Sequence, residues 1–231
     1  MIDVRYENHM GDDLTVVNAA RVSFGKRSKL VCTDSKIGTY EMKKGDVKLV
    51  NYLGSHNHIS PFGHCFASFS VKAPIFVARQ LVKHKFLRWN EISRRYVDDK
   101  PEFYFPPCWK GRPVNVKQGR DEECTIDTAY YDRDDGYNSW DGDAVSIAAE
   151  SYQKMIELGI APEQARMILP QNTMTEWWWS GSLDAFADMC NLRCKPDAQY
   201  ETRLVADLID ERMSELFPVA WATLRDADTD N

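Results

Sequence analysis

The residues with the clearest capacity for chemistry lie in one short stretch, 82–97, which reads VKHKFLRWNEISRRYV. Lysine, histidine and arginine side chains gather there around one carboxylate, Glu91, in a chain whose net charge is −6. A local positive cluster in an acidic chain suits a small anionic ligand, such as a nucleotide or a cofactor phosphate. The amide of Gln80 and the hydroxyl of Ser93 add groups that could orient a base and a sugar. On these residues alone a solvated, charged helix end is the more common explanation, because charge runs on surfaces are frequent, and a phosphorylated ligand is the functional alternative.

Two arginines in other segments support a ligand site. Arg166 lies within the apolar stretch ARMILPQN, and Arg193 follows a segment that is largely apolar on one face. A semi-buried arginine needs an anionic or hydrogen-bonding partner. The residues alone leave open whether a structural carboxylate or a ligand supplies that partner.

A strand followed by a helix positions the basic stretch. The segment CFASFSVK, 65–72, alternates apolar and polar side chains, which predicts a half-buried strand. Pro74 suits the first position of a helix, because proline lacks the amide hydrogen that this position leaves unpaired. Apolar residues then recur at helical spacing as far as Phe86, which turns Gln80, Lys83 and His84 onto another face. The basic stretch therefore begins on a helix end and continues as a loop.

The rest of the chain indicates one α+β domain over 1–231 with a helical C-terminal half. Helices are expected over 144–158, over 162–169, from an N-cap at Ser182 to 192, and through an apolar stripe that ends at Pro218. Residues 14–24 fit a strand or a helix equally well. Residues 98–143 are rich in Pro, Gly, Asp and Tyr, and we expect them to form an irregular excursion from the core.

Composition narrows the function classes. A hydrophobic share of 43% with 28% charged residues is typical of a folded globular protein. The acidic balance argues against a nucleic-acid binder. With no apolar run for a signal or a membrane span, we expect a cytoplasmic protein without a membrane partner.

No metal site is predicted from the sequence. The six cysteines include no C-x-x-C pair, so neither a zinc ribbon nor a disulfide framework is indicated. Cys190 and Cys194 could share a helix face, but two thiols alone make a poor metal site. The acidic run near Asp132 misses the spacing of a calcium loop.

The basic stretch resembles the signature of the flavin-dependent thymidylate synthases. In that family an R-H-R triplet is followed by seven residues and a serine, within N-E-x-S-x-R-Y. Here the triplet is Lys83-His84-Lys85, and Ser93 stands at the family spacing. Other segments resemble the family in its order: NAARVSF (18–24), HISPFGH (58–64), VKAPIFVARQ (71–80), ARMILP (165–170) and NLRCKPDAQYE (191–201). Several ordered segments are far more specific than one triplet.

The resemblance implies a fold and a reaction. It implies a small, mainly antiparallel sheet flanked by helices, in a homotetramer whose active sites are shared between subunits. It implies methylation of dUMP to dTMP, with methylenetetrahydrofolate as carbon donor and FAD, recharged by NADPH, as reductant. Two alternatives stay open: another carbon-5 modification, such as hydroxymethylation, of dUMP or a related pyrimidine nucleotide, and a dUMP-binding homologue with weakened FAD binding.

The resemblance also assigns residues. Arg193 would be catalytic, because its fixed charge could stabilise negative charge on the uracil ring. The dUMP site would comprise Gln80, Glu91, Ser93, Arg94, Arg95, Arg166 and Arg193. The FAD site would comprise His58, Ser60, Lys83, His84, Lys85, Glu91, Ser182 and Asp188.

This sequence departs from the family pattern on the flavin side. Lysine replaces arginine on both sides of His84, which keeps the charge but loses the planar fork for bidentate contacts. Gly63 stands where the family usually has glutamate, Ser182 where asparagine is common and Asp184 where arginine is common. The dUMP assignment is therefore better supported than the FAD assignment.

Overall fold

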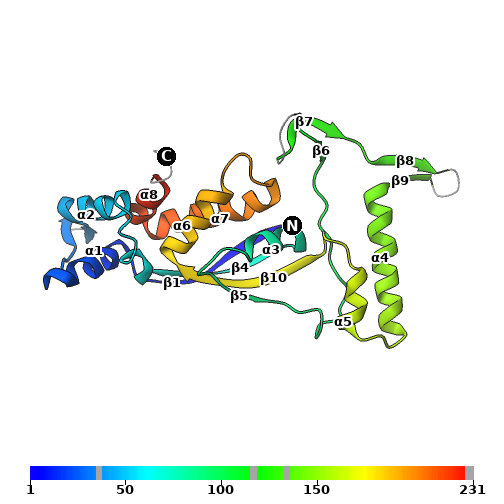
Figure 1. Cartoon of the computed structure of the whole chain (residues 1–231), viewed down its shortest axis with the longest axis horizontal. Coiled ribbons are helices and arrows are strands. Elements are labelled where there is room, and N and C mark those ends of the chain that lie inside the picture. The colour runs from blue at the N-terminus through cyan, green and yellow to red at the C-terminus, as the bar shows by residue number, and fades with distance from the viewer. Residues whose placement is uncertain (35–37, 115–118, 133–135, 227–231) are drawn as a thin grey trace.

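A four-stranded antiparallel sheet forms the centre of the computed structural model, which describes residues 1–34, 38–114, 119–132 and 136–226. The strand order is β1-β4-β10-β5, with bounds Asp3–Met10, Phe66–Pro74, Met174–Ser182 and Arg88–Glu91. Helices cover one face of this sheet (Figure 1). The expected α+β class with an antiparallel sheet is confirmed.

Helices α6 (Leu183–Arg193) and α7 (Tyr200–Leu216) pack on that face, and α1 (Asp13–Arg21), α2 (Lys44–Ser55) and α8 (Pro218–Asp226) extend the same core beside them. Alternation along β4 buries every second side chain against them, as the sequence predicted, and Phe69 and Val71 are fully buried. Phe69 meets Phe186 of α6 edge to face, with ring centroids 5.3 Å apart. These contacts fix α6, and with it Arg193, relative to the sheet.

The basic stretch contains a strand that the sequence did not predict. The helix begins directly after Pro74, as expected, but α3 spans only Ile75–Leu81. Phe86 has a positive φ of 65°, which ends the turn that follows α3. The chain then pairs as β5 with β10 instead of forming a loop, and Trp89 stacks on Trp177 with ring centroids 4.4 Å apart.

The ambiguous segment 14–24 is helical. Asp12 accepts a hydrogen bond from the backbone of Thr15, whose hydroxyl accepts one from the backbone of Asp12, so a complete capping box starts α1. A 3₁₀ turn, Val22–Phe24, ends the segment at Gly25, whose φ of 59° suits glycine. A small hairpin of β2 (Val31–Asp34) and β3 (Thr39–Glu41) leads to α2.

The expectation of an irregular excursion over 98–143 is wrong in part. The described residues form two hairpins, β6 (Trp109–Gly111) with β7 (Asp121–Ile126) and β8 (Ala129–Asp132) with β9 (Gly136–Ser139). Helix α4, Trp140–Glu157, starts before the expected residue 144 because the Ser139 hydroxyl accepts a hydrogen bond from the backbone of Gly142. These elements extend away from the sheet as an arm (Figure 1).

The expected C-terminal helices are present with shifted ends. Helix α5, Pro162–Ala165, is short and continues as the 3₁₀ turn Arg166–Ile168. Ser182 occupies the N-cap position of α6, although its side chain makes no capping hydrogen bond. Within the described ranges, no helix combines the length and apolar character needed to cross a bilayer.

Candidate active site

Three predicted site residues meet where α3 and α6 end. The Nε of Arg193 donates to Nε2 of His84 at 3.0 Å, and a terminal nitrogen of Arg193 donates to the backbone carbonyl of Gln80 at 3.4 Å. Because Nε2 accepts this bond, His84 must be neutral with its proton on Nδ1. The structure thus brings together Gln80 and Arg193, expected at the dUMP site, and His84, expected at the FAD site.

Electrostatics keep His84 neutral. Burial and, to a smaller extent, the neighbouring charge of Arg193 together lower the pKa of His84 from 6.5 to about 4. Burial also lowers the pKa of Arg193 from its usual value, but an arginine remains charged at any working pH. The pair therefore presents a half-buried guanidinium held by an uncharged imidazole.

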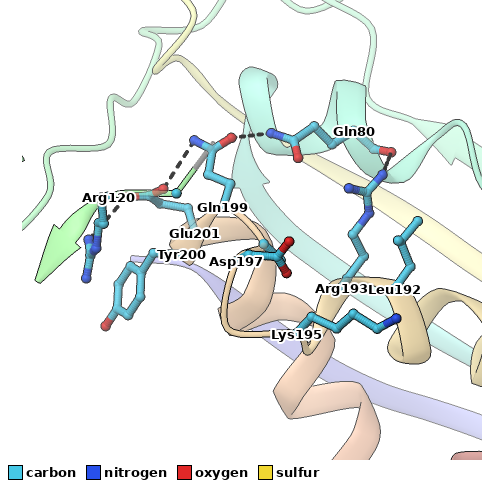
Figure 2. A pocket seen from close by; sticks show the side chains of 11 residues that line it. Gln80, Arg120, Leu192, Arg193, Lys195, Asp197, Gln199, Tyr200 and Glu201 are labelled. Atoms are coloured by element: carbon cyan, nitrogen blue, oxygen red, sulfur yellow. Dashed lines mark hydrogen bonds and ion pairs between the residues drawn. The ribbon is translucent and has the colours of Figure 1, made fainter. Parts of the chain in front are cut away.

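Arg193 borders a cavity of about 630 Å³ between the end of α6, the start of α7 and the arm. Figure 2 shows Arg193 reaching to the carbonyl of Gln80, while the amide of Gln80 donates to Gln199. Gln199 in turn donates to Glu201 at 3.2 Å. This network fixes the amide groups that face the cavity.

Sequence reasoning missed several residues of this cavity. Arg120, from the arm, places its guanidinium carbon 3.7 Å from the centroid of the Tyr200 ring and also contacts Glu201. Lys195 and Gln199 line the same cavity. Lys195, Gln199 and Tyr200 belong to the segment NLRCKPDAQYE, whose family resemblance was a signal that could have found them. Nothing in the sequence indicated Arg120, because its contact joins distant segments.

A second cavity, of about 410 Å³, lies on the other side of Arg193. Its lining includes four predicted FAD residues, Lys83, His84, Lys85 and Asp188, together with Arg193. The two cavities share Arg193 and Leu192. Arg193 therefore borders two cavities, one that also holds the two glutamine amides and one that also holds the Lys83-His84-Lys85 triplet.

His58 and Ser60 line a third and larger cavity, of about 1190 Å³, between α1, α2 and the loop that precedes β4. Lys48 provides positive charge in this cavity, whereas the guanidinium of Arg21 is paired with the buried carboxylate of Asp46. Phe24 and Tyr52 provide aromatic surface. Cations, hydroxyls and aromatic rings in a cavity of this size suit the phosphates and rings of a dinucleotide such as FAD. This donor set fits the cofactor.

Four of the predicted dUMP residues lie beyond the C-terminal end of β5, the end away from His84: Ser93, Arg94, Arg95 and Arg166. The guanidinium of Arg95 lies 3.6 Å from the carboxylate of Glu163, and Arg166 donates to the backbone carbonyl of the same residue at 3.3 Å. Arg94 donates to the carbonyl of Asp99 at 2.8 Å. The expectation that Arg166 is semi-buried is wrong for this chain, because Arg166 is exposed on a 3₁₀ turn.

Glu91, the last residue of β5, lies between the region of His84 and the region of Arg95. Its carboxylate accepts hydrogen bonds from Thr175 at 2.7 Å and from the indole of Trp89 at 3.1 Å. Both partners belong to the paired strands β10 and β5. Glu91 is thus held in place by the sheet while remaining exposed.

Two departures from the family pattern are neighbours in space. A Cβ at Gly63 would lie 3.8 Å from Oδ1 of Asp184, and this oxygen is buried without a hydrogen-bond partner among the described residues. Ser182, two residues earlier at the N-cap of α6, is 9% exposed. A carboxylate here would repel a pyrophosphate, so this part of the predicted FAD site does not fit the cofactor.

Comparisons with known proteins agree on one family. The model of the thymidylate synthase complementing protein family matches residues 6–219. A flavin-dependent thymidylate synthase of Thermus thermophilus is 36% identical over 228 residues, which cover 96% of this chain and 75% of the relative. Another, of Thermosipho melanesiensis, is 34% identical over 222 residues, covering 93% of this chain and 86% of the relative.

Solved structures show the same fold. The structure of a UMP/dUMP methylase from Streptomyces cacaoi bound with 5-Br dUMP is similar with a TM-score of 0.73 and 27% identity, and the match covers 96% of this chain and 94% of the methylase. A structure of that methylase with 5-Br UMP has the same TM-score. The chain belongs to the thymidylate synthase complementing protein family, that of the flavin-dependent thymidylate synthases.

Proposed function

We propose that this methyltransferase carries out the reductive methylation of dUMP to dTMP in the cytoplasm, with methylenetetrahydrofolate as carbon donor and FAD recharged by NADPH. One observation carries the proposal. Arg193 lines both the cavity that contains Gln80 and Gln199 and the cavity that contains the Lys83-His84-Lys85 triplet. A residue so placed can contact a pyrimidine on one side and a flavin on the other.

Arg193 is the proposed catalytic residue. Carbon 5 of the uracil becomes nucleophilic as N3 ionises, and the guanidinium of Arg193 stabilises the negative charge that develops on the ring. His84 keeps this guanidinium in position by accepting the bond from its Nε. Gln80 contributes its amide to base recognition at the same cavity.

The flavin, when bound, supplies the hydride. The proposed FAD residues His58 and Ser60 would hold the cofactor in the large cavity, where Lys48 would supply positive charge to its phosphates. The proposed contacts from Lys83, His84, Lys85 and Asp188 extend along the cavity beside Arg193. Ser182 and Asp184 would contribute less, because their surroundings do not suit a phosphate.

We further propose a homotetramer of single-domain subunits with shared active sites. Glu91, Ser93, Arg94, Arg95 and Arg166 would bind the dUMP whose uracil meets Arg193 of another subunit, since the two groups occupy opposite ends of β5. The arginines beyond β5 would meet the phosphate through charge-assisted hydrogen bonds. Light scattering of the purified protein tests the assembly.

The test of the function compares Arg193→Lys and Arg193→Ala with wild type. Arg193→Lys keeps the charge and loses the Nε bond to His84, whereas Arg193→Ala loses both. We expect kcat to fall about 10²- to 10³-fold in Arg193→Ala and less in Arg193→Lys. Arg79→Ala, an exposed position on α3, is the matched control.

The assay supplies dUMP, methylenetetrahydrofolate, FAD and NADPH, and follows dTMP by mass spectrometry together with NADPH oxidation. Absence of dTMP, with an oxidation rate that dUMP does not change, refutes the proposal. A different product mass identifies another carbon-5 modification. A colourless protein that takes up no FAD, but melts at a higher temperature with dUMP, identifies a binding homologue.

A second candidate is methylation of UMP, favoured by the similarity to a methylase solved with both 5-Br UMP and 5-Br dUMP. Parallel assays with UMP and dUMP decide between the two. A kcat/KM for UMP equal to or above that for dUMP supports the second candidate.

A further inference from the structure

Two cysteines of α6 and one aspartate of α7 form a compact cluster behind the candidate active site. Cys190 and Cys194 are one helical turn apart, so their side chains project from the same face. The two sulfurs and a carboxylate oxygen of Asp210 all lie within 4.8 Å of one another. The sequence had offered only the two thiols, and the packing of α7 on α6 supplies the third group.

These distances suit a small thiophilic cation. In a tetrahedral zinc site each sulfur lies about 2.3 Å from the metal, which places two sulfurs about 3.8 Å apart. The cluster needs only small side-chain adjustments to reach that geometry. Cys194 and Asp210 are partly exposed, so solvent can supply the fourth ligand, while Cys190 is fully buried.

The surroundings of Asp210 resemble those of a metal-binding carboxylate. The indole of Trp221 and the Nε of Arg225 both donate to its Oδ1, at 2.9 and 2.8 Å. Such outer contacts orient a carboxylate whose second oxygen binds a metal. They belong to α8, so the cluster joins three helices of the core.

The charges also balance. Two thiolates and one carboxylate carry three negative charges, and a divalent cation together with Arg225 would supply three positive ones. The S–H of Cys190 donates to the carbonyl of Ala206 at 3.7 Å, and metal binding would release this proton.

We propose that Cys190, Cys194 and Asp210 form a structural site for a thiophilic divalent cation of the zinc type. The site would tie the last turn of α6 to α7 directly behind Arg193, whose position in the chain immediately precedes Cys194. The proposed metal site takes no part in the methylation, and the proposal does not depend on the proposed function.

The first experiment adds Co²⁺ to reduced, metal-free, full-length protein and records the thiolate-to-cobalt charge-transfer absorption. We expect saturation near one Co²⁺ per chain and displacement of the cobalt by Zn²⁺. Cys194→Ser and Asp210→Asn should weaken binding at least about 10-fold, because each removes or alters one ligand. Cys32→Ser, which removes an exposed thiol elsewhere, is the control and should bind as wild type does.

A second measurement needs no variant and so does not depend on whether a substituted chain folds. Alkylation of wild-type cysteines is followed residue by residue with and without Zn²⁺. We expect zinc to slow the alkylation of Cys194 at least about 10-fold relative to Cys32. No charge-transfer band, cobalt binding by Cys194→Ser as tight as that of wild type, or equal alkylation of Cys194 with and without zinc would each overturn the proposal.

Discussion

The neutral state of His84 makes the free energy of unfolding depend on pH in a direction that can be worked out. Unfolded, His84 takes up a proton with a pKa of 6.5, whereas in the folded chain burial and Arg193 lower that pKa to about 4. Below pH 6.5 the unfolded state therefore binds more protons than the folded state. The free energy of unfolding must fall as the pH falls from about 7 towards 4.

The size of this effect follows from the two pKa values. Between pH 7 and pH 5 they correspond to a loss of about 1.8 kcal/mol if converted in full. His84 is only half-buried, so solvent screens its surroundings, and we expect about 1 kcal/mol. Burial is the larger cause, so removing Arg193 should recover only the smaller part of the effect.

The assay is urea denaturation of ligand-free protein at pH 7 and pH 5, at one protein concentration. His84→Gln removes the titrating group, so its loss of stability over this range should be smaller than that of wild type by about 1 kcal/mol. His56→Gln, at an exposed histidine that ends α2, is the control. An NMR titration of the histidine resonances, with His84 identified from the variant, gives its pKa directly.

Two outcomes would refute the reasoning. An equal loss of stability in wild type and in His84→Gln would show that this imidazole does not remain neutral on folding. A His84 resonance that titrates near 6.5 would show the same without any denaturation. Either result would also remove the basis for placing the His84 proton on Nδ1.

Three further predictions concern the core, and urea denaturation at pH 7 measures each. Phe69→Ala should cost about 3–5 kcal/mol because Phe69 is fully buried, whereas Val22→Ala, at a residue 73% exposed, should change stability by about 0.5 kcal/mol or less. Asp13→Ala should cost about 1–3 kcal/mol because both carboxylate oxygens accept hydrogen bonds from backbone amides in α8, and an equally stable variant would contradict this. Gly54→Ala should cost about 1–3 kcal/mol because its Cβ would lie 2.2 Å from Cγ2 of Thr223, and a second change, Thr223→Ser, which removes that methyl, should restore part of the loss.

The sequence predicted those elements whose signals are local. Proline at position 74 and the spacing that follows it located α3, and strict alternation located β4. Strand β10 was not predicted, because three consecutive tryptophans conceal the alternation of buried and exposed side chains along it. Trp177 and Trp179 are buried, whereas Trp178 between them is 45% exposed and donates its indole hydrogen to Ser180.

The family resemblance named residues of the candidate site. Residues that enter the site only through contacts between distant segments, and that the resemblance did not name, were not predictable. Gln80, His84 and Arg193 come together because α3 and α6 end side by side. The contribution of Arg120 depends on how the arm returns to α7, which no local pattern encodes. The sequence also did not predict that Arg95 lies apart from Arg193, because this separation depends on β5 being a strand of the sheet.

Strand β5 also carries a built-in optical reporter. Trp89 stacks on Trp177 at 4.4 Å and meets Trp179 edge to face at 5.7 Å, so these indoles are close enough for their excited states to interact. The contribution of the Trp89 contacts to the circular dichroism is lost when β5 leaves β10. Because β5 connects the region of His84 to that of Arg95, this contribution reports on the segment that joins the two halves of the site, without any added label.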